Sequence, residues 1–493
     1  MHCLGQDSGQ LQRTREISAD MSQSEGWLRP AGYLEQVQSK LYDDNNVGIS
    51  YVLRIVTSRE VNDCDVKQAF IHLLRKTINL RMLPQMRDGQ LWMRELQHEE
   101  LDFQTFGDAD VNAVYHNMAT YRYNMNVGPA WAVRFLPLSP KQVDYIKQTT
   151  MENADTKLKT LPHVSHIVMS FHHSITDGCT NVRIIRHIMM LLNDVIAGNP
   201  IDDSQQYAQI LDIKKQELIS QELENAFKAD PDLLKARVES LMRSFPEALL
   251  SKAYPQPSKR PPKMVCIPRI LDSRSTANFI SRCKKEGITV HTGFSSVIEA
   301  SIVQALLDAN CLQDEFTIGG LHCIDQRRYF NDVENAYGNG FGTMDVTTDV
   351  SKDIVANFWS HAKQYHAKFK DQQRRMNSME LEVIYKLTGK NPFVFIDSQG
   401  IDSPLPRVAS YITTNVRDVT KILSNFGQNV DIIYYDWMSA VQEIGYEWVS
   451  SIHTFNGQLL HNLHYNTQLM DEALALKIAD SIFEILRQVV EQP

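Results

Sequence analysis

Residues 170 to 180, SFHHSITDGCT, bring two histidines, an aspartate and a glycine close together in a chain of 493 residues. An unperturbed imidazole has a pKa of about 6.5, so a neutral histidine can take a proton from a nucleophile and return it to a leaving group. Asp177, four residues after His173, can fix a tight loop by accepting hydrogen bonds or by pairing with an arginine. Gly178 removes side-chain bulk where the chain turns. These residue types at this spacing predict a site of general-base catalysis.

Two other interpretations fit the same stretch. In the first, His172 and His173 are half-buried and satisfied by backbone groups, while Asp177 caps the following helix. The second is a metal site, because four histidines fall within eleven residues: His163, His166, His172 and His173. Neighbouring strand residues point to opposite faces, however, and no carboxylate-rich segment stands out to complete a ligand set. We therefore expect no metal.

The spacing His-x-x-x-Asp is not specific by itself. His98 and Asp102, in HEELD, share it, but they lie in a charged run with no apolar strand before them. Other enzyme signatures are absent from the sequence: GxSxG, GxxxxGK[ST], HExxH, and a GxGxxG that opens a helix after a strand. The alternating glycines of YGNGFG (337–342) lack the phosphate-loop spacing and predict a loop or a bulged strand.

The elements around the stretch are a strand and a helix. HIVMSF (166–171) predicts a buried strand, and one apolar stripe follows it: Ile185, Ile188, Met189, Leu192 and Ile196. This periodicity predicts a helix that ends at Gly198, just before Asn199-Pro200. The histidines are thus expected at the C-terminal end of a strand, where α/β proteins commonly place ligands.

Both halves of the chain mix strand and helix patterns, as an α/β or α+β protein does. In the first half, VGISYVLRIV predicts a strand and VKQAFIHLLRKTI a helix. In the second half, HTGFSSVIEASIVQALL predicts a helix, and two strand-like runs flank Asn456-Gly457, a strong hairpin signal. An amphipathic helix ends the chain, with one apolar face formed by Ile478, Ile482, Ile485 and Val489.

Polar and proline-rich stretches divide the chain into four predicted segments. Residues 1–28 form a polar leader without the apolar core of a secretory signal, and residues 29–200 form a first lobe that carries the histidines. Residues 201–263 comprise a charged helical segment and the proline-rich linker YPQPSKRPPK. Residues 264–493 form a second lobe.

Composition excludes several classes of protein. With 43% hydrophobic and 22% charged residues, the chain has the make-up of a soluble globular protein. A net charge of -9 with dispersed Lys and Arg residues gives no footprint for nucleic acid, so we expect no nucleic-acid partner. No long uncharged apolar window predicts a transmembrane segment. Seven scattered cysteines without a CxxC pair predict reduced thiols and a cytoplasmic location.

The stretch FHHSITDG resembles the HHxxxDG motif of the chloramphenicol acetyltransferase-like superfamily, which includes peptide-synthetase condensation domains, alcohol acetyltransferases and BAHD acyltransferases. Three further segments agree in order. GPAWAVRFL (128–136) resembles a strand upstream of that motif, and CIDQRRYF (323–330) with AYGNGF (336–341) resembles the D-x-R and Y-x-G-N succession. SNFG (424–427) resembles the S-N-x-G of alcohol acetyltransferase-like members, whereas the DFGWG of BAHD members is absent.

The resemblance runs from about residue 30 to the C-terminus and implies a fold and a reaction. The fold class is α/β, with α+β two-layer lobes: two similar chloramphenicol acetyltransferase-like lobes in a V with a tunnel between them. His173 would lie near the middle of the tunnel as the general base. It would deprotonate an acceptor hydroxyl or amine for direct attack on an acyl thioester, without a covalent acyl-enzyme.

The resemblance also implies supporting roles for residues around that histidine. Asp177 is expected to point away from the tunnel and to pair with Arg327, with Arg328 as the rival partner. Gly178 would leave room at the tunnel wall, and His172 would be a further supporting residue. Of the later segment, Ser424 or Asn425 would lie near the developing oxyanion or the donor. For Asn339 and Gly427 we expect structural roles.

We therefore expect a free-standing, monomeric acyltransferase that moves an acyl group from acyl-CoA to a small alcohol or amine acceptor. It would need no cofactor, since acyl-CoA is the co-substrate. The alternatives are a condensation-type enzyme that takes its acyl group from an acyl carrier protein, a noncatalytic condensation-like binding module, and a metal-dependent hydrolase that uses the histidine cluster. The sequence contains no adenylation or carrier module.

Overall fold

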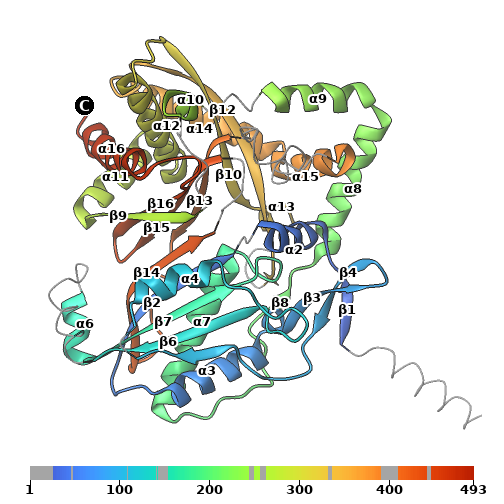
Figure 1. Cartoon of the computed structure of the whole chain (residues 1–493), viewed down its shortest axis with the longest axis vertical. Coiled ribbons are helices and arrows are strands. Elements are labelled where there is room, and N and C mark those ends of the chain that lie inside the picture. The colour runs from blue at the N-terminus through green and yellow to red at the C-terminus, as the bar shows by residue number, and fades with distance from the viewer. Residues whose placement is uncertain are drawn as a thin grey trace, which may run out of the picture.

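The computed structural model shows an α/β chain folded into two lobes, one above the other in Figure 1. It describes residues 26–45, 48–107, 109–139, 142, 154–243, 249–255, 263–330, 336–389, 409–440 and 446–492. Most of the expected leader, residues 1–25, and the greater part of the expected proline-rich linker, residues 256–262, lie outside the described residues.

The first lobe is built on a five-stranded sheet of order β14-β2-β7-β6-β5. Its strands are β2 (Ile49–Thr57), β5 (Phe103–Thr105), β6 (Trp131–Pro137), β7 (His163–Phe171) and β14 (Val430–Ser439). Helices α3 (Asp63–Lys76) and α7 (Gly178–Ala197) pack against one face, and α4 (Val111–Ala119) packs against the other. The structure confirms the strand predicted from VGISYVLRIV as β2, the strand predicted from HIVMSF as β7, and the helix predicted from VKQAFIHLLRKTI as α3. It also confirms that α7 ends at Gly198, which has φ of 69°.

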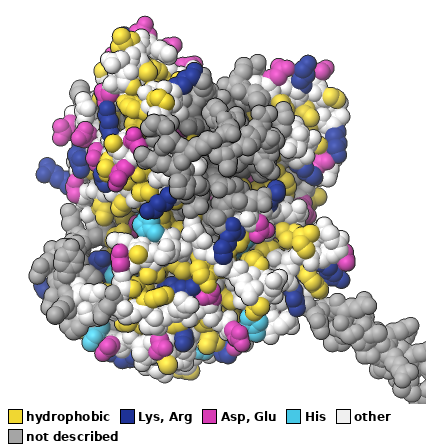
Figure 2. Space-filling view, viewed as in Figure 1, with side chains coloured by type: hydrophobic (Ala, Val, Ile, Leu, Met, Phe, Trp, Pro, Cys, Tyr) yellow, Lys and Arg dark blue, Asp and Glu magenta, His cyan; other side chains and the backbone are white. Residues whose placement is uncertain are grey.

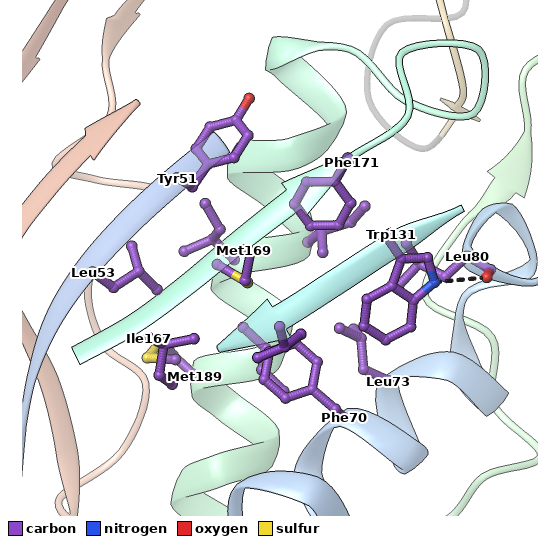
Figure 3. Packing of buried hydrophobic residues seen from close by; sticks show 14 of the residues in the cluster. Tyr51, Leu53, Phe70, Leu73, Leu80, Trp131, Ile167, Met169, Phe171 and Met189 are labelled. Atoms are coloured by element: carbon purple, nitrogen blue, oxygen red, sulfur yellow. Dashed lines mark hydrogen bonds between the residues drawn. The ribbon is translucent and has the colours of Figure 1, made fainter. Parts of the chain in front are cut away.

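Alternation along β7 fills the core between this sheet and helices α3 and α7. Ile167, Met169 and Phe171 point to these helices, as Figure 3 shows, whereas Val168 points to the α4 face. The indole of Trp131 packs in the same layer and donates a hydrogen bond to a backbone carbonyl at 2.9 Å. Because successive strand residues point to opposite faces, the two histidines that follow Phe171 leave the strand in different directions.

The second lobe contains a six-stranded sheet of order β12-β10-β13-β15-β16-β9. The strands are β9 (Met264–Leu271), β10 (Glu315–Asp325), β12 (Phe341–Ser351), β13 (Ala409–Asp418), β15 (Tyr446–Phe455) and β16 (Gln458–Asn466). Four helices form a second core on this sheet: α11 (Ser273–Lys285), α12 (Val290–Asp308), α14 (Phe358–Arg374) and α16 (Glu472–Val490). The hairpin at Asn456-Gly457 and both predicted helices are confirmed.

Helix α12 is the central helix of this second core. It alone, among the described helices, is long and apolar enough to cross a membrane by length and composition. Of its apolar window, 78% is buried inside the protein, which is typical of a core helix.

Smaller elements complete the chain. A three-stranded sheet of order β1-β4-β3 and a two-stranded sheet of β11 and β8 flank the first lobe: β1 (Trp27–Pro30), β3 (Met82–Arg87), β4 (Gln90–Glu95), β8 (Gln209–Ile210) and β11 (Ala336–Tyr337). The remaining helices are η1 (Ile78–Arg81), α2 (Tyr33–Asn45), α6 (Ala154–Thr160), α8 (Ile213–Ala229), α9 (Pro231–Arg243), α10 (Leu249–Ala253), α13 (Arg327–Phe330) and α15 (Asn377–Thr388). Helices α8 and α9 confirm the predicted helical segment; in Figure 1, α8 rises along one side of the upper lobe and α9 lies across its top.

Acidic and basic side chains are interspersed over the face shown in Figure 2, and neither sign gathers into a single stripe there. This distribution matches the dispersed charges of the sequence.

One strand that follows residue 264 in the sequence belongs to the sheet of the first lobe. Strand β14 comes from the second half of the chain but pairs antiparallel with β2 of the first sheet, from Val430 opposite Thr57 to Ser439 opposite Ile49. Local periodicity cannot reveal this exchange, because it depends on which distant strand the segment pairs with. The side chain of Asn462, on β16, donates to Asp436 of β14 at 2.6 Å, so β14 also contacts the second sheet.

A pH-dependent stability is expected from Asp436. Burial raises the pKa of its carboxyl to about 6, above the ordinary value of 3.8, although hydrogen bonds from Asn462, the Trp437 N–H and Tyr434 oppose the shift. Because the folded state holds this proton more tightly than the unfolded chain does, its contribution is complete below pH 3.8 and is lost as the pH rises through about 6.

We therefore expect the stability of the wild type, relative to Asp436→Asn, to fall by about 2.5 kcal/mol between pH 4 and pH 7, since each pH unit between the two pKa values is worth about 1.4 kcal/mol and part of the effect is already lost at pH 4. Urea unfolding midpoints of both proteins at four pH values measure the difference. Parallel pH curves for the two proteins would contradict the assignment.

Candidate active site

His173 lies in the turn between β7 and α7, and its ring is held by the backbone. Its Nδ1 is 2.8 Å from the carbonyl oxygen of Thr176. A carbonyl only accepts, so Nδ1 carries the proton in this hydrogen bond and Nε2 keeps a free lone pair. The side chain is half-buried and lines a cavity, and no described residue bonds to its Nε2.

The environment of His173 keeps its imidazole neutral. Burial lowers the pKa of His173, and the hydrogen bond to Thr176 and the charge of Asp177 oppose this effect only in part. The ring of Phe341 stacks on the imidazole, with centroids 4.6 Å apart and planes 27° from parallel. A neutral, oriented imidazole with a free nitrogen can accept a proton from a molecule in the cavity.

His172 is a structural residue of the turn. It is fully buried, its Nδ1 accepts a hydrogen bond from the Ser174 N–H at 3.1 Å, and its ring lies 4.3 Å from that of Tyr42. Burial lowers its pKa to about 3, so it stays neutral. His172 does not line the cavity, and its buried Nε2 has no hydrogen-bond partner among the described residues.

The carboxylate of Asp177 is fully occupied by hydrogen bonds. One oxygen accepts the Thr180 N–H at 2.8 Å and caps α7, and the other accepts Arg327 Nη1 at 2.6 Å and the Gly340 N–H at 2.8 Å. Burial alone would raise the pKa of Asp177, but the Arg327 guanidinium and these N–H groups hold it below its ordinary value. The helix cap and the ion pair, considered as alternatives from the sequence, are both present.

Arg327, on α13, uses all of its donors. Besides Asp177, its Nη1 contacts Asp325 Oδ1 at 3.2 Å, its Nη2 donates to Thr180 Oγ1 and the Gly338 carbonyl, and its Nε donates to a third backbone carbonyl. Its side chain is 1% exposed. Arg327, and not its neighbour Arg328, is the partner of Asp177, whereas Arg328 lines the cavity.

The YGNG segment wraps around this buried ion pair. Tyr337 bonds His187 of α7 at 2.7 Å, and the Gly338 carbonyl and Gly340 N–H contact Arg327 and Asp177. A Cβ atom on Gly340 would lie 2.8 Å from Arg327 Nη1, so only glycine fits here. Asn339 is buried and does not line the cavity, as a structural role would require.

A cavity of about 620 Å³ lies between the lobes, with walls from both. The first lobe contributes His173, Gly178 and Cys179, and β14 contributes Trp437 and Ser439. The second lobe contributes a largely apolar wall: Ile324, Phe341, Phe369, Ile412, Val416, Val449 and Ile452. A cavity of this size and lining suits a small molecule with a few polar groups.

Gly178 leaves room where the lobes meet. A Cβ at this position would lie 3.0 Å from a methyl carbon of Val416, tighter than most contacts of real Cβ atoms. Two thiols, those of Cys179 and Cys323, also face the cavity, but burial raises the pKa of each to about 12. Neither cysteine is therefore poised as a thiolate nucleophile.

Ser424 and Asn425 do not line the cavity, contrary to the expectation from the SNFG segment. The Ser424 carbonyl accepts Arg186 of α7 at 2.7 Å, its hydroxyl donates to the Lys421 carbonyl, and Asn425 is exposed in a left-handed turn with φ of 58°. A Cβ on Gly427 would collide with the side chain of Asn193, so the segment packs on α7. The similarity of SNFG to a four-residue motif therefore did not predict where this segment lies relative to the cavity.

Two other histidines considered from the sequence have structural partners. His166 accepts a hydrogen bond from Arg54 at 3.0 Å, and His98 bonds the Val127 carbonyl while Asp102 pairs with Arg134. In the part of the chain that the structure describes, no group of three or more His, Cys, Asp and Glu side chains is placed to hold a metal ion.

Phe341, the Thr176 carbonyl and Thr180 were not anticipated as parts of the site. Phe341 is the residue that follows YGNG, and Thr180 comes three residues after Asp177, the spacing of a helix cap. These positions next to the motif residues were the signals in the sequence that could have pointed to Phe341 and Thr180. The stacking of Phe341 on His173 could not be inferred, because it depends on how the two lobes meet.

No protein-family model and no curated protein matches this chain. Among solved structures, TRI3 trichothecene 15-O-acetyltransferase from Fusarium sporotrichioides superposes with a TM-score of 0.66 at 12% identity, over 94% of this chain and 98% of that one. The condensation domain of the Monacolin K polyketide synthase MokA gives 0.65 at 14%, over 95% and 99%. The EpoB NRPS cyclization-docking bidomain from Sorangium cellulosum gives 0.61 at 12%, over 100% and 94%.

These comparisons confirm the expected fold over nearly the whole length of the chain. It is the two-lobed fold of condensation domains and chloramphenicol acetyltransferase-like proteins. At identities of 12 to 14% the likeness extends to the fold, so the chemistry of the site rests on the residues of this chain.

We expect Asp177→Asn to isolate the contribution of the ion pair. The amide oxygen can still cap α7, but Arg327 loses its nearer and more buried counter-charge, and breaking such a pair costs about 3–5 kcal/mol. A lower urea unfolding midpoint measures the loss. Asp325→Asn is the matched control, because Asp325 contacts the same Nη1 at 3.2 Å with 19% of its side chain exposed. An equal effect of both variants would contradict the role of Asp177.

Proposed function

We propose that this protein is an acyltransferase that moves an acyl group from a thioester to a hydroxyl, or less readily an amine, of a small-molecule acceptor. The observation that carries the proposal is His173, a neutral imidazole in the cavity with Nδ1 bonded to a carbonyl and Nε2 free. The shared fold with an acetyltransferase and with condensation domains supports it. Acyl-CoA is the proposed donor.

In the proposed step, Nε2 of His173 takes the proton of the acceptor hydroxyl while the hydroxyl oxygen attacks the thioester carbon. The tetrahedral intermediate collapses, the carbon–sulfur bond breaks, and the imidazolium returns its proton to the leaving thiolate. The products are an ester and a free thiol, with no other reactant. The raised thiol pKa values of Cys179 and Cys323 favour this direct transfer over a cysteinyl acyl-enzyme.

Asp177 has no place in the proton transfer. Its carboxylate is bonded to Arg327, Thr180 and Gly340, while Nδ1 of His173 is bonded to the Thr176 carbonyl. The ion pair instead holds the turn that positions His173. This arrangement differs from a Ser-His-Asp triad, in which the aspartate bonds the imidazole directly.

The same site can accept an acyl group from a carrier protein, because such a donor presents the same thioester. A noncatalytic binding module is the alternative of a different class, and the open cavity with a free Nε2 on its wall argues against it. In either catalytic version, the proposed protein acts as a monomer in the cytoplasm.

Replacement of His173 is the direct test. We expect His173→Ala to lower acceptor-dependent thiol release from acetyl-CoA and longer acyl-CoAs, assayed with pooled alcohols and amines, by about 10²- to 10⁴-fold, the usual contribution of a general base. His98→Ala is the matched control, because His98 has an aspartate at the same spacing but bonds the Val127 carbonyl outside the cavity. Equal transfer by wild type and His173→Ala would overturn the proposal.

The pH profile provides a second test. The base must be neutral, so kcat/KM falls when the pH drops through the pKa of His173, which burial holds below its ordinary value of 6.5. We therefore expect activity to persist down to pH 6.5 and the acidic limb to lie below it. A limb centred at or above 6.5, measured under kcat/KM conditions, would show that another group titrates.

A further inference from the structure

Basic residues of the second lobe that the proposed reaction does not use line the cavity, Lys370 among them, and the acidic residues Asp325 and Asp418 also line it. Arg328, His291 and Arg417 all line it. Arg328 is half-buried, with its Nε donating to the Asp325 carbonyl at 2.9 Å, and Arg417 is exposed. Among the described residues, no carboxylate forms an ion pair with either arginine. Two unpaired positive charges beside a cavity favour a negatively charged ligand.

The backbone around Arg417 deviates from regular strand geometry in a way that presents this side chain. Arg417 has φ of 70°, a left-handed conformation that non-glycine residues seldom adopt. It lies where the pairing of β13 with β15 shifts register, between Asn415 and Asp418, and its N–H donates to Asn415 Oδ1 at 2.7 Å. Bulges of this kind redirect side chains and are frequent next to functional sites, where backbone strain is retained.

The imidazole of His291, in the first turn of α12, is held by a chain of hydrogen bonds between buried side chains. Its Nε2 is 3.0 Å from His322 Nδ1, His322 Nε2 is 2.6 Å from the Tyr365 hydroxyl, and that hydroxyl is 3.1 Å from the hydroxyl of Tyr411. His322, Tyr365 and Tyr411 are fully buried. A Cβ on Gly320 would lie 2.6 Å from the Tyr411 ring, so a glycine makes room for the end of the chain.

The tautomer of His291 is adjustable, unlike that of His173. His322 Nδ1, which also lies 2.6 Å from the Thr413 hydroxyl, can donate to His291 and leave a proton on the Nδ1 of His291, or it can accept there while its Nε2 donates to Tyr365. No described residue bonds to the Nδ1 of His291. Burial and the charges of Arg417 and Arg328 lower its pKa to about 4, so it acts as a neutral hydrogen-bonding group and a poor base. Its chemistry is that of a binding residue.

We propose that Arg328, Arg417 and His291 form an anion-binding subsite of the cavity, in which the arginines supply charge and His291 a directed hydrogen bond. The inference rests on the proposed function and extends it by assigning a negatively charged group, a phosphate or a carboxylate, to one substrate. Its source is either the phosphate of a phosphopantetheine-bearing donor or a carboxylate of the acceptor. His322, Tyr365 and Tyr411 are positioning residues for His291.

Binding measured by calorimetry on the full chain tests the subsite without any turnover. The probes are 4′-phosphopantetheine against pantetheine, which lacks the phosphate, and hexanoate against hexanol, which lacks the carboxylate. We expect one anionic probe to bind at least about tenfold more tightly than its neutral partner, and Arg328→Gln/Arg417→Gln to remove that preference. Preference for phosphopantetheine identifies the donor as the source, and preference for hexanoate identifies the acceptor.

Lys421→Gln is the matched control, because Lys421 is an exposed cation four residues after Arg417 that does not line the cavity. It should keep the preference. His291→Phe should weaken the preferred anion severalfold, and His322→Phe should do the same if His291 depends on its partner. If neither anion binds better than its neutral partner, or if the double arginine variant keeps the preference, the subsite is wrong.

The proposed acyl transfer and the proposed anion-binding subsite can be tested independently of each other. Transfer from the N-acetylcysteamine thioester of acetate, which has no phosphate or carboxylate, tests His173 alone. His173-dependent transfer without an anion preference would overturn the subsite and leave the proposed function standing. An arginine-dependent anion preference without any His173-dependent transfer would overturn the proposed function and leave the subsite standing.

Discussion

The buried ion pair between Asp177 and Arg327 is the interaction on which the rest of the site depends. Removing two charges from water costs several kcal/mol each, so such a pair persists only when every remaining hydrogen-bonding position is filled. Here the arginine uses all of its donors, and the carboxylate accepts two N–H groups besides the guanidinium. To satisfy these bonds, the turn before α7, the helix α13 and the YGNG segment must meet at one place. The position of His173 follows from that meeting.

Because the carboxylate is fully used in holding the structure, the imidazole is oriented by other means. A backbone carbonyl three residues away sets the tautomer of His173, and the ring of Phe341 from the other lobe covers one face. The first contact is local to the turn, whereas the second exists only when the lobes are assembled. Base orientation and lobe assembly are thus linked through one short segment, since Phe341 directly follows the glycines that contact the ion pair.

The sequence allowed prediction of the features that repeat at short range or belong to an extended motif. The stripe of α7, the hairpin at Asn456-Gly457, the fold and the pairing of Asp177 with Arg327 were all predictable. The entry of β14 into the first sheet was not, because pairing partners far apart in the chain leave no mark in local periodicity. The site in the SNFG segment was misplaced for a related reason: four residues define a turn but not the surface on which it packs.

The exchanged strand also constrains how the cavity can be reached. β14 is hydrogen-bonded along β2 of the first lobe, and Asp436 on it is bonded to Asn462 of the second. Wide separation of the lobes would break the ladder or take the Asn462 donor away from a buried carboxyl, and both changes are costly. A ligand that enters the cavity therefore reaches His173 while the two lobes stay together.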